Sequence, residues 1–221
     1  LVAGRWAEEG TAFERPHGDG LTVDYDTPEA FEEVFWRVFE GNAYMRRDAL
    51  IPMTAGDDTI QAYRTYVSLV LKRGGGARYL AKNTYNVLRL PSLLQAFPRA
   101  MVVIPVRAPL AHAASLRAQH RRFTELARQD AFTSAYMRWL GHYEFGPHAR
   151  PIATGVAPHP RAFSRDSLDH WLAQWLNVYR HVAAQLPSLG GSVVVLPYER
   201  LCEAPHDAWA DLAERVGLPA G

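Results

Sequence analysis

Three polar segments, each placed directly after an apolar segment, contain residue types suited to binding an anion. They are Lys82-Asn83-Thr84-Tyr85-Asn86 after residues 78–81, Arg107-Ala108-Pro109 after residues 101–106, and Tyr198-Glu199-Arg200-Leu201 after residues 192–197. Open parallel sheets bind ligands outside the carboxyl ends of their strands, so strands at the three apolar segments would bring these polar residues to one edge. The pattern therefore predicts a ligand site at that edge.

Arg107 has the clearest chemistry of these residues. It stands between an apolar segment and Pro109, and proline is typical of the first position of a helix. A guanidinium fork beside the free N–H groups of a helix N-terminus suits a phosphate. The expected helix carries four more arginines up to Arg128, for which a solvated basic face is the simpler interpretation.

The helices and strands that must position this site alternate along the chain. Helical spacing of apolar residues, with helix start and stop residues, predicts helices beginning near residue 28 and over residues 59–73, 88–97, 109–128, 168–182 and 205–216. Short apolar runs predict strands at residues 78–81, 101–106 and 192–197, the second of them buried on both faces. Residues 141–166, rich in Gly, Pro and His, are expected to form a surface excursion. This order predicts an α/β fold with three layers, a parallel sheet with flanking helices, in one domain over residues 1–221.

Gly74-Gly75-Gly76 admits two interpretations, a phosphate-binding loop or the end of a helix. A P-loop continues with Lys-Ser or Lys-Thr, whereas this triplet continues with Ala77 and Arg78. We therefore expect a helix stop followed by a turn.

The composition restricts the classes to which the protein can belong. Its 221 residues, 48% of them hydrophobic, suffice for one sizeable core. The formal charge of +1 gives no reason to expect nucleic acid or an anionic membrane as a partner, and no apolar run reaches the ~20 residues that span a bilayer. Cys202 is the single cysteine, which excludes an internal disulfide and a cysteine-based zinc site. A soluble protein of the cytoplasm fits these features, which leave the oligomeric state open.

Five short motifs follow one another between residues 78 and 219. They are Lys82-Asn83-Thr84-Tyr85-Asn86, Phe97-Pro98-Arg99-Ala100, Val106-Arg107-Ala108-Pro109, Ser115-Leu116-Arg117-Ala118-Gln119-His120, and Tyr198-Glu199-Arg200-Leu201 with the later Gly217-Leu218-Pro219. This series resembles the sulfotransferase superfamily, particularly its bacterial branch. The central block of that branch runs Lys-Asn-Pro-x-Asn, Phe-Pro-x-Ala, Val-Arg-Asp-Pro, Ser-Leu-x-x-x-His, and its last strand ends in Tyr-Glu-x-Leu.

The resemblance implies transfer of a sulfuryl group from 3′-phosphoadenosine 5′-phosphosulfate (PAPS) to a hydroxyl or amine of a small-molecule or carbohydrate acceptor, without a metal. It also implies a fold like that of P-loop nucleotide-binding proteins. Arg107 and Ser115 would hold the 3′-phosphate, and Tyr198 would lie against the adenine or simply pack. Lys82 would approach the transferring sulfuryl group and its bridging oxygen, where negative charge grows.

The acceptor hydroxyl needs a base, and several histidines are candidates. His120 matches the family pattern, although a histidine on a helix surface is the common alternative, and in related enzymes a carboxylate near the phosphosulfate loop can serve. His142 and Glu144 lie on the irregular excursion. Asn83 and Asn86 would order their loop or contact the acceptor, or only make Asx turns.

The chain departs from the family at two points. Ala108 replaces the aspartate of Val-Arg-Asp-Pro, so the carboxylate that would cap the helix is missing. The Gly-rich loop that cradles the 5′-phosphosulfate, with its strand, does not occur, and we expect both to precede Leu1 in the natural protein. The segment from Gly141 to Ser164 is expected to shape the acceptor pocket.

Two other classes are considered. A non-catalytic nucleotide- or polysaccharide-binding domain could keep the sulfotransferase-like fold without that loop. A P-loop kinase would need a Lys-Ser or Lys-Thr loop and an acidic magnesium ligand after a strand, and neither is visible.

Overall fold

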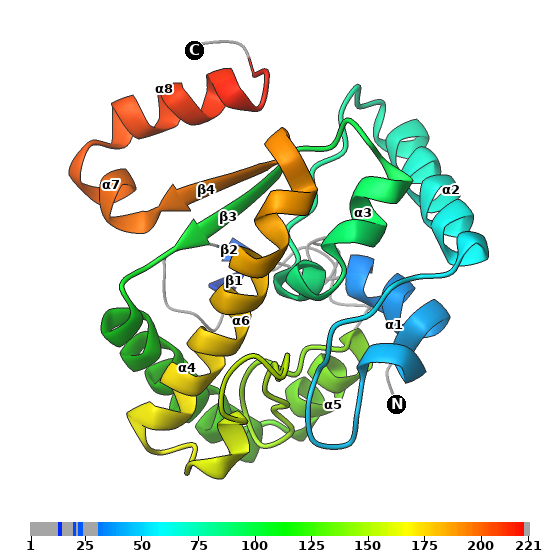
Figure 1. Cartoon of the computed structure of the whole chain (residues 1–221). Helices are drawn as coiled ribbons and strands as arrows, with labels where there is room; N and C mark the ends of the chain where they lie inside the picture. Colours follow the sequence, from blue (N-terminus) through cyan, green and yellow to red (C-terminus); the bar gives the residue numbers. More distant parts are fainter. Residues whose placement is uncertain (1–12, 15–19, 21, 24–30, 219–221) are drawn as a thin grey trace.

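The computed structural model describes residues 13–14, 20, 22–23 and 31–218 (Figure 1). Its helices are α1 (Phe31–Tyr44), α2 (Asp57–Gly74), α3 (Leu90–Ala96), α4 (Pro109–Gln129), α5 (Ala131–Leu140), α6 (Leu168–Leu189), α7 (Tyr198–Glu203) and α8 (Pro205–Arg215), with the 3₁₀ turns η2 (Thr84–Leu88), η3 (Pro160–Ala162) and η4 (Gly190–Ser192). Its strands are β1 (Phe13–Glu14), β2 (Thr22–Val23), β3 (Val102–Val106) and β4 (Val193–Pro197). The fold is α/β and mainly helical, as the alternating pattern predicts. No described helix has both the length and the apolar character needed to cross a membrane.

The parallel pairing of β3 with β4 is the part of the sheet that positions the site. Val102 pairs with Val193 and Val106 with Pro197, so both strands end at the same edge. α6 crosses this pair (Figure 1) and packs on it through Val182, which lies with Ile104 in one hydrophobic cluster. The parallel connection predicted from the sequence is confirmed.

The strand predicted at residues 78–81 is not formed, because side chains rather than a ladder hold this segment. The Tyr79 hydroxyl donates to Glu32 Oε2 at 2.8 Å, and Arg78 Nη1 donates to the carbonyl of Val216 at 3.0 Å. Leu80 remains 90% exposed. The described residues thus contain one parallel pair, and the three-layer sheet is not confirmed.

The prediction that residues 101–106 are buried on both faces is wrong. Ile104 is buried, whereas Met101 is 38% exposed and Pro105 is also exposed. In the described structure β3 has β4 as its one strand neighbour, and Val195 of β4 is itself 41% exposed.

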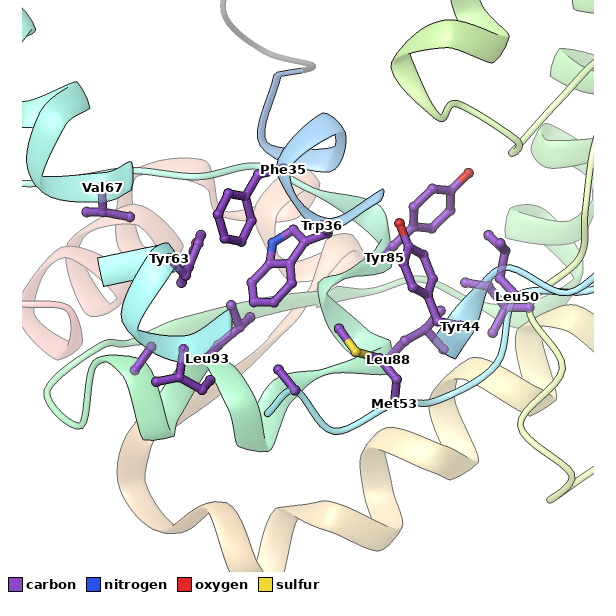
Figure 2. Close-up of a cluster of buried hydrophobic side chains, with 14 residues drawn as sticks. Phe35, Trp36, Tyr44, Leu50, Met53, Tyr63, Val67, Tyr85, Leu88 and Leu93 are labelled. Carbon is purple, nitrogen blue, oxygen red and sulfur yellow. The ribbon is translucent and has the colours of Figure 1, made fainter. Parts of the chain in front are cut away.

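A second, larger hydrophobic cluster joins α1, α2 and α3 (Figure 2). Trp36 lies at its centre with no exposed surface, its ring 4.6 Å from that of Tyr63 and 5.3 Å from that of Phe35. Val87, in the turn after Lys82, packs against both this cluster and the one under β3. The Lys82 turn is therefore attached to the strand that leads to Arg107.

The predicted helices and helix stop agree with the structure over the described residues. α2 ends at Gly74, and Gly75 adopts φ 63°, a left-handed conformation that glycine accepts without strain. The predicted start of the first helix, at Thr27-Pro28-Glu29, lies outside the described residues.

The segment 141–166 is irregular, as predicted, but it is not simply a surface excursion. Ile152 is 4% exposed, and the backbone on either side of it pairs with Leu50, whose N–H donates to Pro151 O and whose carbonyl accepts from Ala153 N, both at 2.9 Å. The segment is therefore fixed to the body of the protein at its middle.

Candidate functional site

The backbone at the end of β3 is held from α6. Trp175 Nε1 donates to the carbonyl of Arg107 at 3.1 Å, and the Tyr179 hydroxyl donates to the carbonyl of Pro105 at 2.9 Å. These two bonds give carbonyls at the end of β3 side-chain partners from α6. They fix the position from which the Arg107 side chain leaves the sheet.

Arg107 and Tyr198 come together at the shared edge of the two strands. The guanidinium carbon of Arg107 lies 5.0 Å from the centroid of the Tyr198 ring, a cation–π contact. Tyr198 is 41% exposed, and Arg107 beside it is partly exposed. Arg107 forms no ion pair with any residue that the structure describes. Its charge acts on the nearby Glu199 carboxylate, but no described residue occupies the guanidinium in an ion pair, so the guanidinium can bind an anionic ligand.

The N–H of Ala108, the residue before α4, is bound from the end of the neighbouring strand. The Ala108 N–H donates to Glu199 Oε1 at 2.8 Å. This bond, followed by one from its own N–H, lowers the pKa of the exposed Glu199 carboxyl. The α4 N-terminus therefore has no side-chain cap, as expected from Ala108, and because Glu199 occupies the Ala108 N–H an anion here would depend on the Arg107 side chain more than on that N–H.

Ser115 lies on α4 together with a histidine that the sequence analysis did not single out. His112 is one turn before Ser115, which places both on one face of the helix. Burial and then the nearby Arg107 charge lower the pKa of His112, so its ring is neutral near pH 7. The sequence indicated this histidine only by its position, in the first turn of the helix that starts just after Arg107.

Lys82 lies in an exposed segment without regular secondary structure, just before η2, rather than at a strand end. The side chains of Asn83 and Asn86 give this turn its shape. Asn83 Oδ1 accepts from Tyr85 N at 2.9 Å, and Asn86 Oδ1 accepts from Arg89 Nε at 3.0 Å. Both asparagines therefore order the loop, one of the roles anticipated for them.

The turn is anchored on a buried charged network that the sequence analysis missed. Arg89, with no exposed surface, pairs with Glu33, and its guanidinium lies 4.6 Å from the centroid of the Trp36 ring. Glu33 also accepts from Tyr44 and, at 2.7 Å, from Asn83 Nδ2. Two features of the sequence indicated this network. One is the pair of acids in a helix rich in aromatic residues, and the other is an arginine inside an apolar run.

A histidine–carboxylate pair lies beside this network. His142 Nδ1 is 3.5 Å from Glu144 Oε2, and His142 Nε2 is buried without a hydrogen-bond partner among the described residues. Burial would lower the pKa of His142, but the hydrogen bond and charge of Glu144, with the charge of Glu33, raise it overall. The charge of Lys82 acts on His142 in the opposite direction, which places the two in one neighbourhood.

His120 has a different environment. It is buried between α4 and the excursion, its ring 5.3 Å from that of Trp171, and its Nδ1 accepts from Gly146 N at 3.2 Å. Burial, followed by the charge of Arg165, lowers its pKa to about 4. A neutral imidazole has one lone-pair nitrogen, and here the N–H of Gly146 occupies it. These surroundings favour packing over proton transfer.

Comparisons of the chain with protein-family models, with curated proteins and with solved structures find no match. The function has to be argued from the residues and their geometry.

Proposed function

We propose that the protein is a PAPS-dependent sulfotransferase. The observation that carries the proposal is the meeting of Arg107 and Tyr198 at the carboxyl ends of two parallel strands, directly before the long helix α4. A guanidinium that forms no ion pair with a described residue, next to an exposed aromatic ring, is suited to the 3′-phosphate and adenine of the donor. Ser115, two turns along α4, would complete the phosphate contacts. A P-loop-like sheet of three layers would be the full form of this fold.

Lys82 and His142 would act at the other end of the donor. In the transfer step the bond from sulfur to the bridging phosphate oxygen breaks while a bond from sulfur to the acceptor oxygen forms. Lys82 would stabilise the charge that develops on the bridging oxygen. The acceptor proton would pass to a base.

We infer that His142 is this base rather than His120. Glu144 orients the Nδ1 side of the His142 ring, and its Nε2 lone pair is not engaged by any described residue. His120 offers no such lone pair. Tyr143 lies between His142 and Glu144, and its N–H donates to the Tyr85 hydroxyl at 2.7 Å. Because Tyr85 lies in the turn after Lys82, this bond connects the histidine–carboxylate pair to that turn.

Lys82→Ala is expected to reduce the rate of transfer on the order of 10²-fold while nucleotide affinity changes by only a few fold, the typical effect of removing one charge-stabilising donor. Release of adenosine 3′,5′-bisphosphate from PAPS, with a phenol, a saccharide and a tyrosine peptide as acceptors, measures the rate. Lys72→Ala, at the exposed end of α2, is the matched control and should leave the rate unchanged.

If the Lys82 variant transferred sulfuryl groups at the wild-type rate, Lys82 would have no role in catalysis. A wild-type protein that carries the expected phosphosulfate loop, binds the bisphosphate and releases none from PAPS would instead support the non-catalytic nucleotide-binding alternative.

A further inference from the structure

A pocket of about 240 Å³ opens between the end of α5, the turn after Met45 and the irregular segment 147–165. Its lining is almost entirely polar, and five of its residues are arginines: Arg47, Arg138, Arg150, Arg161 and Arg165. None of the residues assigned above to the nucleotide lies in its wall.

The pocket carries a large local excess of positive charge. Five guanidinium groups face one carboxylate, that of Asp48, and none of the five forms an ion pair with a residue that the structure describes. Burial and then the charge of Arg161 lower the pKa of Arg165, and burial followed by two neighbouring arginines lowers that of His148. Five positive charges against one carboxylate repel one another, so an anion that enters the pocket would relieve this repulsion.

Several of these arginines are held in place rather than free to move apart. Arg165 Nη2 donates to the carbonyl of Ala149 at 2.5 Å, and the Arg150 guanidinium lies 4.2 Å from the centroid of the Tyr143 ring. Arg37 Nη1 donates to the carbonyl of Arg138 at 2.8 Å and so fixes the end of α5. The guanidinium groups of Arg150 and Arg165 are therefore positioned before a ligand arrives, which lowers the cost of binding.

We propose that this pocket binds a tetrahedral oxyanion, a sulfate or a phosphate group. Planar guanidinium forks bind such groups through paired hydrogen bonds, and the wall contains arginine without lysine. The volume is below the ~300 Å³ at which sites for whole drug-sized ligands begin, so it suits one anionic group. The site is separate from the Arg107 edge and does not depend on the proposed function. Tyr143 joins it to His142 and Glu144, so a sulfated or phosphorylated molecule held here would reach toward that pair.

The test uses the double variant Arg47→Gln/Arg161→Gln, because both side chains are exposed and neither makes a hydrogen bond through its guanidinium to a described residue. Arg180→Gln, an exposed arginine on α6, is the matched control. The melting temperature is measured against sodium sulfate and sodium phosphate, with sodium chloride at equal ionic strength as reference. A bound ion stabilises the folded protein in proportion to its affinity.

We expect sulfate or phosphate to raise the melting temperature of the wild type and of Arg180→Gln in a saturable way. The double variant should bind the ion at least ~10-fold more weakly, since each charge-assisted hydrogen bond contributes about 1.5–3 kcal/mol. Equal responses in all three proteins would show a general salt effect and overturn the proposal. The proposal would also be overturned if sulfate and phosphate raised the melting temperature of the wild type no more than chloride does.

Two further arms identify the source of the anion. Tighter binding of a sugar 6-sulfate than of inorganic sulfate would support a sulfate ester carried by a larger ligand, and equal binding would support a free ion. Adenosine 3′,5′-bisphosphate should bind the double variant as it binds the wild type. An equal loss for this nucleotide would mean that the pocket belongs to the donor site, and the separate site would be refuted.

Discussion

Replacing Arg89 by methionine is expected to lower the free energy of unfolding by about 3–5 kcal/mol, because the variant leaves the buried Glu33 carboxylate without its counter-charge. Both side chains are almost fully enclosed, at 0% and 5% exposed, so solvent does not screen the pair. For a chain of this length the loss corresponds to a fall of roughly 6–20 °C in melting temperature. Thermal unfolding followed by circular dichroism measures it.

The double variant Glu33→Gln/Arg89→Met should recover part of this loss, because it leaves no unpaired charge in the core. Arg73→Met, on the exposed last turn of α2, should unfold like the wild type. An Arg89 variant as stable as the Arg73 variant would show that the buried pair of Arg89 and Glu33 does not stabilise the fold.

His142→Gln is expected to reduce sulfuryl transfer by about 10²- to 10⁴-fold, the range for removing a general base. His206→Gln, on the exposed side of α8, is the control and should transfer at the wild-type rate. His120→Gln should lose stability before it loses activity, because its ring packs against Trp171.

The pH profile separates a base from a packing residue. The pKa of His142 is raised, so the wild-type rate should increase as the pH rises through a value above 6.5 and the ring loses its proton. In Glu144→Gln the charge that raises this pKa is gone, burial then dominates, and the rising limb should move to lower pH. A profile that does not move would remove His142 from the role of base.

Local patterns predicted the elements of the fold better than their assembly. The helix at residues 109–128 and the stop at Gly75 depend on proline, glycine and apolar spacing within a few residues, and both are found. The strand at residues 78–81 failed because its fate depends on partners distant in sequence, namely Glu32 for Tyr79 and Val216 for Arg78. Four residues of extended propensity do not become a strand without a neighbour to pair with.

The candidate site shows the same division. The meeting of Arg107 with Tyr198 could be anticipated, because parallel strands end at one edge. The hydrogen bond from the Ala108 N–H to Glu199 could not, since it joins residues 91 apart in sequence. The pairing of Arg89 with Glu33 is likewise a product of packing between helices, and no local pattern encodes it.

Calorimetric titration of adenosine 3′,5′-bisphosphate and adenosine 5′-phosphate into the wild type, Arg107→Ala and Ser115→Ala tests the proposed function most directly. The wild type should bind the bisphosphate more tightly than the monophosphate. Arg107→Ala should weaken the bisphosphate about 10- to 100-fold, and Ser115→Ala should weaken it less, because a hydrogen bond to a charged group contributes about 1.5–3 kcal/mol. The monophosphate should bind all three proteins alike. Equal losses for both nucleotides, or no preference of the wild type for the bisphosphate, would contradict a 3′-phosphate site at Arg107 and with it the sulfotransferase assignment.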